Sequence, residues 1–123
     1  MSRKPSEDLQ LLDQQVMLAV ARLHPDAYGV SIQEEIKKAG RAVSFGAIYA
    51  ALDRLELKGF VQSRQGEPTP ERGGRRKLYF VATTRGRLAL EGSLAIMDAL
   101  RNGVRAESEP SRPSSFRASN PTP

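Results

Sequence analysis

The order in which hydrophobic periodicities follow one another limits the fold of this 123-residue chain more than any other feature. Three segments carry apolar residues at spacings of three and four, which is the repeat of an amphipathic helix. Two short runs rich in β-branched and aromatic residues follow at 60–64 and 77–81, separated by a loop rich in Gly and Pro. A fourth apolar segment with helical spacing closes the pattern. The sequence therefore predicts a mainly α fold with a small β-hairpin, in the order α-α-α-β-β-α.

The first two helices are bounded by residues that stop helices. The first carries an apolar stripe over residues 9–23 and ends before Pro25, which disfavours helix in the residue that precedes it. The second has its apolar residues on one face and ends at Gly40, a natural C-terminal stop. At its start we expect the ring of Tyr28 under the helix, and Gly29 where close packing needs a small residue.

The third helix presents two different faces. Ser44 can act as its N-cap by accepting a hydrogen bond from a free backbone N–H, and Gly59 closes it. The stripe expected in the core consists of Phe45, Ile48, Leu52 and Leu55. The opposite stripe consists of Ala47, Ala51, Arg54 and Lys58. Small residues lead on that second stripe and cations trail, which suits a helix that enters a DNA groove and has positive charge beside the phosphates.

Charge is concentrated in one part of the chain. Residues 44–88 hold nine basic and four acidic side chains, and the resulting +5 equals the formal charge of the whole chain. Residues 1–43 carry six of each sign and residues 89–123 carry four of each, so both flanks are neutral. Such a basic patch favours a polyanionic partner, and double-stranded DNA is the partner that we expect. The cations of the hairpin loop and its edge are Arg72, Arg75, Arg76 and Lys77.

Three helices followed by a basic hairpin form the winged helix-turn-helix arrangement. In it the third helix enters the major groove, and the hairpin contacts the flanking backbone or the minor groove. The sequence therefore predicts a DNA-binding protein. The residues expected at the DNA are Ser44, Ala47, Tyr49, Ala51, Arg54, Lys58, Arg72, Arg75, Arg76 and Lys77.

Several of these residues have competing roles. Tyr49 either bonds a phosphate through its hydroxyl or completes the core, and its apolar body and polar tip fit both. Ser44 is a structural cap that can also bond a phosphate from the helix N-terminus. Arg54 has acidic neighbours on its own helix, so surface pairing is the alternative to DNA contact. Strand alternation puts Arg76 and Lys77 on opposite faces, so one of the two is expected at a phosphate.

The domain organisation follows from composition. We expect a flexible N-terminus at 1–8, a DNA-binding domain at 9–83, a C-terminal dimerisation helix at 84–104 that Thr83 caps, and a disordered tail rich in Pro and Ser at 105–123. A foldable part of about 95 residues is marginal for a monomer. The fourth helix is apolar over more than half its circumference, so a second chain is expected to cover it. The residues expected in this homodimer interface are Leu9, Leu12, Leu90, Leu94, Met97, Leu100 and Val104.

Composition argues against several functional classes. Without Cys there is neither a disulfide framework nor a thiolate zinc site, and the single His24 has no companion ligands at metal-binding spacing. No Ser, His and Asp arrangement or Gly-rich phosphate loop is visible, so we expect no enzyme, no metal and no cofactor. No apolar run is long enough to span a bilayer, and no signal peptide is visible. The expected location is the cytoplasm, without a membrane partner.

Five segments together resemble the PadR family of transcriptional regulators. They are residues 28–32 (YGVSI), 44–49 (SFGAIY), 52–60 (LDRLELKGF), 66–79 of the hairpin loop, and 83–86 (TTRG). The resemblance covers about residues 9–104, with a single C-terminal helix as in the short members of the family. It implies a homodimeric, DNA-binding repressor that dimerises through this helix.

A small-molecule effector, of unknown identity, is a further partner that the resemblance suggests. Some members of the family respond to flat aromatic compounds near the dimer interface. The chain has no Trp, and its C-terminal helix has no aromatic residue, which argues against such a stacking site here.

Two alternative functions remain open from the sequence. One is a function dominated by ligand sensing, which an apolar cavity between the first and fourth helices at the dimer interface would indicate. Winged helices also serve as protein-interaction or dimerisation modules that do not bind DNA. The concentration of charge on the third helix and hairpin favours DNA binding over this alternative. Two-fold symmetry predicts a pseudo-palindromic operator with half-sites roughly 10 bp apart, or a multiple of that spacing.

Overall fold

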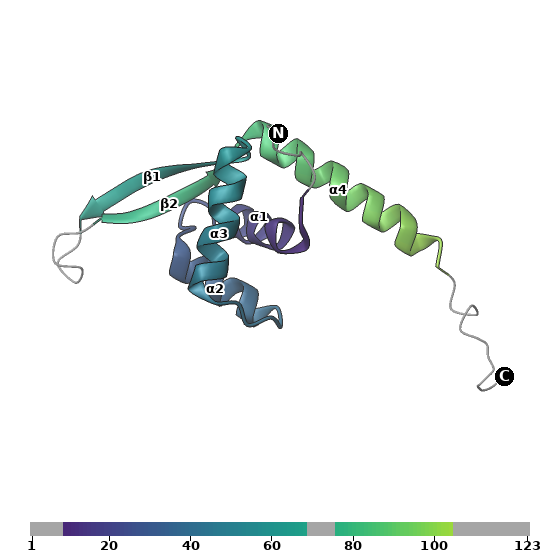
Figure 1. Cartoon of the computed structure of the whole chain (residues 1–123), viewed down its shortest axis with the longest axis horizontal. Helices are drawn as coiled ribbons and strands as arrows, with labels where there is room; N and C mark the ends of the chain where they lie inside the picture. The colour runs from purple at the N-terminus through teal and green to yellow at the C-terminus, as the bar shows by residue number, and fades with distance from the viewer. Residues whose placement is uncertain (1–8, 69–75, 105–123) are drawn as a thin grey trace, which may run out of the picture. The chain divides into compact units, whose positions relative to one another are not determined.

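The structure, a computed structural model, describes residues 9–68 and 76–104, and every structural statement below concerns these residues. Figure 1 traces their elements in chain order. The elements are α1 (Leu11–Leu23), α2 (Gly29–Lys38), α3 (Phe45–Leu57), β1 (Val61–Pro68), β2 (Arg76–Ala82) and α4 (Thr84–Asn102). The expected order α-α-α-β-β-α and the winged helix-turn-helix fold are confirmed. The expectations for 1–8, 105–123, Arg72 and Arg75 fall outside the described residues, as does the side chain of Arg76.

The second and third helices end at glycine residues, as the sequence predicted. Gly40 and Gly59 follow α2 and α3 with φ of 116° and 79°, a left-handed conformation that is easy only for Gly. The next residue along donates back to the last turn in each case, from Arg41 to the Ile36 carbonyl at 3.2 Å and from Phe60 to the Leu55 carbonyl at 2.8 Å. In each helix the glycine N–H also donates to the carbonyl three residues earlier. The two bonds together form the Schellman arrangement, which satisfies carbonyls that the helix leaves open.

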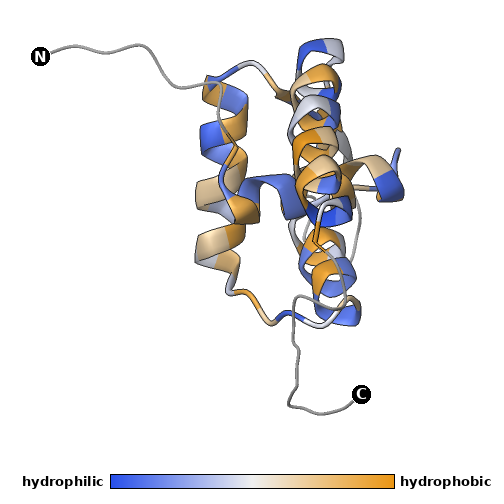
Figure 2. Cartoon of the chain, turned by 90° about the vertical axis from the view of Figure 1, so that its right-hand side faces the viewer, coloured by the Kyte–Doolittle hydropathy of each residue, from blue (hydrophilic) through white to orange (hydrophobic). Residues whose placement is uncertain are grey.

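The core lies among α1, α2, α3 and the start of the hairpin, and Figure 2 shows how apolar residues share each helix with polar ones. The buried stripe of α3 differs from the expected one in two residues. Ala51 is 0% exposed, whereas Phe45 is 44% exposed. A helix turns roughly 100° per residue, which places Ala51 about 40° from Leu55 and about 60° from Ile48, at the edge of the core stripe. Phe45 is the first helical residue, at the solvent edge of that stripe.

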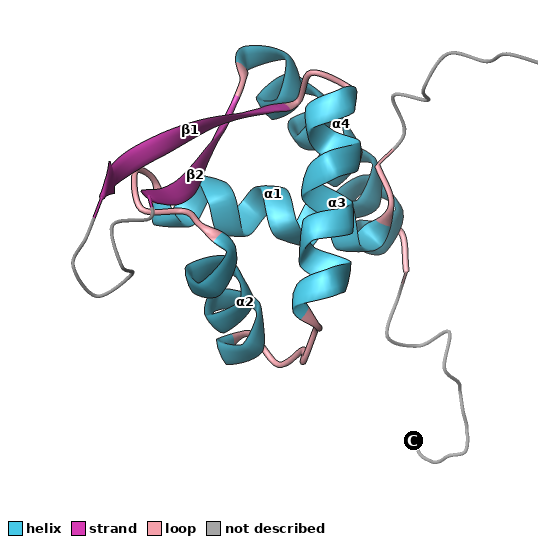
Figure 3. Ribbon diagram, turned by 60° about the vertical axis from the view of Figure 1, so that its left-hand side comes forward, coloured by secondary structure: helices cyan, strands magenta, loops and turns pink. Residues whose placement is uncertain are grey.

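The hairpin formed by β1 and β2, called the wing below, is antiparallel, with Val61 opposite Ala82 and Arg64 opposite Tyr79. Figure 3 shows the two strands side by side and the short loop that joins α2 to α3. The loop before α2 also pairs with the wing through an isolated β-bridge that the sequence did not reveal. Tyr28 forms a β-bridge with Tyr79, and the Phe80 N–H donates to the Ala27 carbonyl at 2.8 Å. The wing is therefore tied to the beginning of α2.

The beginning of α4 is held against the end of α3 and the start of the wing. Thr83 caps α4 as expected, because its hydroxyl accepts the Gly86 N–H at 3.0 Å, and it also donates to the Gly59 carbonyl at 2.7 Å. A Cβ on Gly86 would collide with the backbone carbonyl of Phe60. Close contact between two backbones is therefore the reason for Gly at this position.

The chain divides between Glu91 and Gly92, inside α4, into two units that are described separately. Beyond that point α4 exposes large apolar side chains, with Ile96 64%, Met97 55% and Leu100 68% exposed. Within the described parts of the chain, the helices are too short or too polar to cross a bilayer.

Candidate nucleic-acid interface

The face of α3 that points away from the core is exposed, although the hydroxyl end of Tyr49 lies over Gly29. It carries Gly46, Tyr49, Ala50, Asp53 and Leu57, all of them exposed. This face lies opposite the buried stripe, on the side of the helix that a partner can reach. Ser44 caps the helix by accepting the Ala47 N–H at 3.1 Å, which confirms its structural role.

The stripe predicted to face DNA lies on the flank of α3 instead. Ala51 is fully buried, so its assignment as a DNA contact is wrong. Ala47, Arg54 and Lys58 are half-buried and border the core rather than the open face. The misplacement has a simple cause. The low bulk of Ala suits a groove-facing surface, but Ala51 is a small core residue packed against its neighbours.

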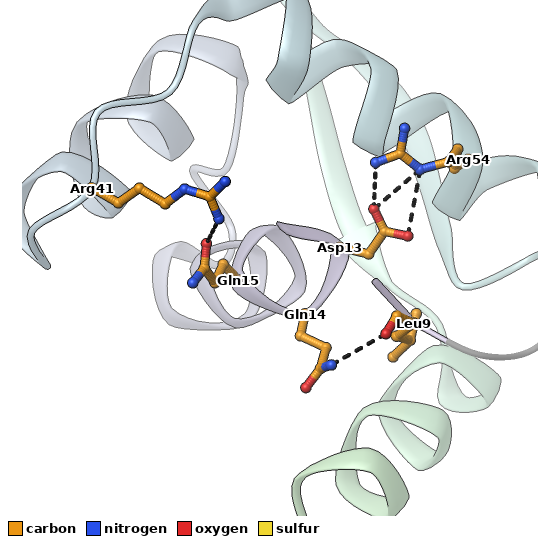
Figure 4. A network of polar contacts seen from close by, with 6 residues as sticks. All are labelled: Leu9, Asp13, Gln14, Gln15, Arg41 and Arg54. Atoms are coloured by element: carbon orange, nitrogen blue, oxygen red, sulfur yellow. Dashed lines mark hydrogen bonds and ion pairs between the residues drawn. The ribbon is translucent and has the colours of Figure 1, made fainter. Parts of the chain in front are cut away.

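Arg54 is committed to an ion pair that the sequence did not reveal (Figure 4). Its Nη2 donates to Asp13 Oδ1 at 2.7 Å, and its Nε lies 3.2 Å from Oδ1 and 3.5 Å from Oδ2. Asp13 lies in α1 and its side chain is 0% exposed, whereas the Arg54 side chain is 35% exposed. The pair joins α1 to α3 across 41 residues of sequence. A signal for it existed, because Asp13 interrupts the apolar stripe of the first helix three residues before Val16.

Two hydrogen bonds and one packing contact surround the start of α3. Gln33 donates to the Val43 carbonyl at 2.8 Å, which braces the loop between α2 and α3. Arg41 donates to the Gln15 side chain at 2.6 Å, as Figure 4 also shows. The hydroxyl end of Tyr49 lies over Gly29, where a Cβ would collide with it. The expected close packing at Gly29 is thus present, and its partner is the ring of Tyr49, which remains 42% exposed.

Contacts among aromatic rings and cations hold the wing against Tyr28, the residue before α2. The rings of Tyr28 and Tyr79 meet edge to face, with centroids 5.5 Å apart and planes inclined by 66°. The Lys77 Nζ lies 4.2 Å from the centre of the Tyr28 ring, and the Arg64 guanidinium lies 5.0 Å from that of Tyr79. Tyr28 therefore packs under the wing as well as at the start of α2.

These cation–π contacts leave the wing positively charged. A ring attracts a cation through its quadrupole but carries no net charge, so Arg64 and Lys77 keep theirs. Arg54 differs, because the Asp13 carboxylate compensates its charge inside the fold. Among the described cations of this region, those of the wing are therefore better suited to attract phosphates than Arg54 is.

The residues predicted at a dimer interface fall into three groups. Leu90 is 4% exposed, and its burial inside its own unit corrects its assignment as an interface residue. Leu9, Leu12 and Leu94 are half-buried. The exposed ones are Met97, Leu100 and Val104.

Among the hollows of the described residues, two border α1. A surface groove of about 570 Å³ lies between α1 and α2, lined by apolar residues such as Leu18 and Ile36 and edged by the Arg22–Glu35 ion pair. A smaller hollow of about 220 Å³ is lined by α1, β2 and Arg87 of α4.

Comparison with known proteins identifies the fold and the family. A family model described as "Transcriptional regulator PadR-like family" matches residues 17–92, more than half of the chain. A PadR-like transcription factor from Bacteroides fragilis has a similar structure, with a TM-score of 0.63 and 27% sequence identity. That similarity covers 75% of this chain and 84% of the other.

Two further structures show the same fold at lower identity. A PadR family transcriptional regulator from Eggerthella lenta DSM 2243 gives a TM-score of 0.64 at 24% identity, over 82% of this chain and 90% of the other. A PadR-like transcriptional regulator from Bacillus cereus strain ATCC 14579 gives a TM-score of 0.68 at 19% identity, over 82% of this chain and 94% of the other. No curated protein matches the sequence.

Proposed function

The chain belongs to the PadR-like family of transcriptional regulators, and from this premise we propose that it is a homodimeric repressor. It binds a pseudo-palindromic operator in double-stranded DNA, in the cytoplasm. Members of the family are regulators rather than enzymes, and the proposed activity is accordingly binding without catalysis. The observation that carries the proposal is the open face of α3 beside a wing that keeps its positive charge.

The two elements have different tasks in this proposal. The open face of α3 enters the major groove, where base edges carry sequence information. The wing contacts phosphates, which supplies affinity without sequence preference. The cations assigned to phosphates are Arg64, Arg72 and Arg75, together with one of Arg76 and Lys77, which strand alternation places on opposite faces.

Dimerisation is assigned to the apolar face that α4 exposes beyond Gly92. Ile96 and Leu100 are four residues apart and therefore share one side of the helix, with Met97 beside them. Side chains of this size that are 55–68% exposed favour a partner surface. Replacing Leu100 with Glu is expected to give a monomer in sedimentation. Asp98→Asn, on the opposite side of the helix, is the control and is expected to stay dimeric.

The primary test is selection of duplexes from a random pool at about 150 mM salt. An inverted repeat with half-sites roughly 10 bp apart, or a multiple of that, is the expected product.

A second measurement concerns the wing. Arg75→Ala with Arg76→Ala should weaken binding to all duplexes alike and lower the salt slope by about one for each lost phosphate contact. Arg101→Ala, outside the DNA-binding unit, is the control.

The rival function is a protein-interaction module that does not bind DNA. A folded, dimeric protein that recovers no duplex from the pool would support the rival and refute the regulator. Binding without any preferred sequence would refute the operator and leave an architectural role. A wing double variant with unchanged affinity and salt slope would refute the phosphate assignment alone.

A further inference from the structure

Helix α3 is short of the side chains that usually identify bases. In the major groove Arg and Lys donate to guanine, Asn and Gln both donate to adenine N7 and accept from N6, and Ser and Thr add further hydrogen bonds. Between Phe45 and Leu57 the helix has no Lys, Asn, Gln, Ser or Thr, and its one Arg is bound to buried Asp13. The open face therefore offers Tyr49 as its hydroxyl donor and Asp53 as an acceptor, among apolar and small residues.

Gly46 is placed where the fold does not require it. A Cβ added at Gly29 or Gly86 would collide with neighbouring atoms, which explains those two glycines. At Gly46 the nearest atom to such a Cβ is the Ser44 hydroxyl oxygen, at 3.9 Å, so the position is open. Gly in a helix costs stability relative to Ala. A Gly kept in the first turn of an exposed face is therefore explained by the close approach of another molecule to the backbone.

Apolar side chains flank this opening. Phe45 is 44% exposed and adjoins Gly46. Ala50 lies one turn after Gly46, on the same side of the helix as Gly46. Tyr49 adds the exposed part of its ring. Among the groups that base pairs present in the major groove, the apolar one is the 5-methyl group of thymine, which Ala and Phe contact well.

We infer that α3 recognises thymine: Phe45 and Ala50 contact the 5-methyl groups of thymines in each half-site, and Gly46 lets the helix backbone come close to the base edges. This inference rests on the proposed function and specifies which chemical group of the operator is read. It predicts half-sites with thymines at the centre of the α3 contact, rather than a guanine held by an Arg.

The test removes single methyl groups from the DNA. In the operator recovered by selection, each thymine is replaced in turn by deoxyuridine, and affinity for the full-length protein is measured by fluorescence anisotropy. Each contacted methyl should contribute about threefold to fourfold in affinity. The same loss should appear at the symmetric position of the other half-site. Thymines outside the half-sites serve as controls and should show no loss.

Protein variants then assign the contacts. With Phe45→Ala the loss caused by deoxyuridine should disappear at one position per half-site, because the methyl has no partner there. Gly46→Ala should weaken operator binding at least tenfold, while the melting temperature stays equal or rises because Ala is the better helix former. A structural role for Gly46 would instead lower the melting temperature, and that result would refute its assignment.

The outcomes separate this inference from the function on which it rests. If a preferred sequence is recovered but every deoxyuridine duplex binds as tightly as its parent, thymine recognition is refuted and the regulator stands. If no duplex is preferred, the proposed operator fails and the inference fails with it. Thymine recognition would be established by a loss of affinity that is confined to half-site thymines and that Phe45→Ala abolishes at one position.

Discussion

Replacing Arg54 with Met is expected to destabilise the fold strongly, because it leaves the carboxylate of Asp13 buried without its charged partner. The Asp13 side chain is 0% exposed and receives hydrogen bonds from the guanidinium at 2.7 and 3.2 Å. Breaking a buried ion pair from one side costs about 3–5 kcal/mol. The Arg54 side chain is 35% exposed, so water already screens part of the pair, and the lower value of about 3 kcal/mol applies.

The magnitude can be measured by urea unfolding followed by circular dichroism, at one fixed protein concentration because dimerisation contributes to stability. A loss of about 3 kcal/mol corresponds to a fall of roughly 12–24 °C in the thermal midpoint of a small domain. Arg22→Met is the matched control. Its guanidinium pairs with Glu35 at 2.6 Å but is 77% exposed, and exposed pairs contribute at most about 1 kcal/mol.

A double variant tests whether the loss of stability comes from the unpaired carboxylate. Changing Asp13 to Leu together with Arg54→Met removes both charges and is expected to restore stability to within about 1 kcal/mol of the original protein. The reasoning is refuted if Arg54→Met costs no more than Arg22→Met. If it instead left stability intact and lowered the salt slope of DNA binding by about one, Arg54 would be a phosphate contact, as the sequence pattern suggested.

Three further predictions concern single positions. Gly86→Ala should lose about 2 kcal/mol or more in urea unfolding because its Cβ meets the Phe60 carbonyl, whereas Gly92→Ala, in open space in the same helix, should gain about 0.5–1 kcal/mol. Ser44→Ala should cost about 1 kcal/mol in the same assay, since it removes the N-cap of α3, and an unchanged midpoint would contradict the capping bond. Tyr28→Leu should cost about 1–2 kcal/mol by removing the ring under the wing, and Tyr28→Phe, which keeps the ring, should cost less than half of that.

The parts of the fold that depend on neighbouring residues were predictable. Gly40 and Gly59 adopt positive φ where a helix stop was expected, and Ser44 and Thr83 cap the helices that they precede. Each of these features involves atoms a few residues apart, so the sequence contains both partners within one short window. The order of elements followed from the same local signals.

The orientation of α3 was harder to predict. The pattern placed Phe45 in the core and Ala51 at the DNA, and the structure exposes the first and buries the second. Ala fits both a tight core and a groove-facing surface, so its identity does not decide between them. Packing against α1 and α2 decides which face of α3 is buried, and the sequence of α3 alone does not contain that information.

The sequence by itself determined the element order, the helix ends, the basic character of the wing and the apolar face of the last helix, because local conformation and charge are properties of short segments. Tertiary structure alone decided which face of α3 is open, that Arg54 pairs with Asp13, and that Ala27 and Tyr28 pair with β2. The last two of these features join residues at least 41 positions apart. Their partners are selected by burial and geometry in the assembled core, which no short stretch of sequence specifies.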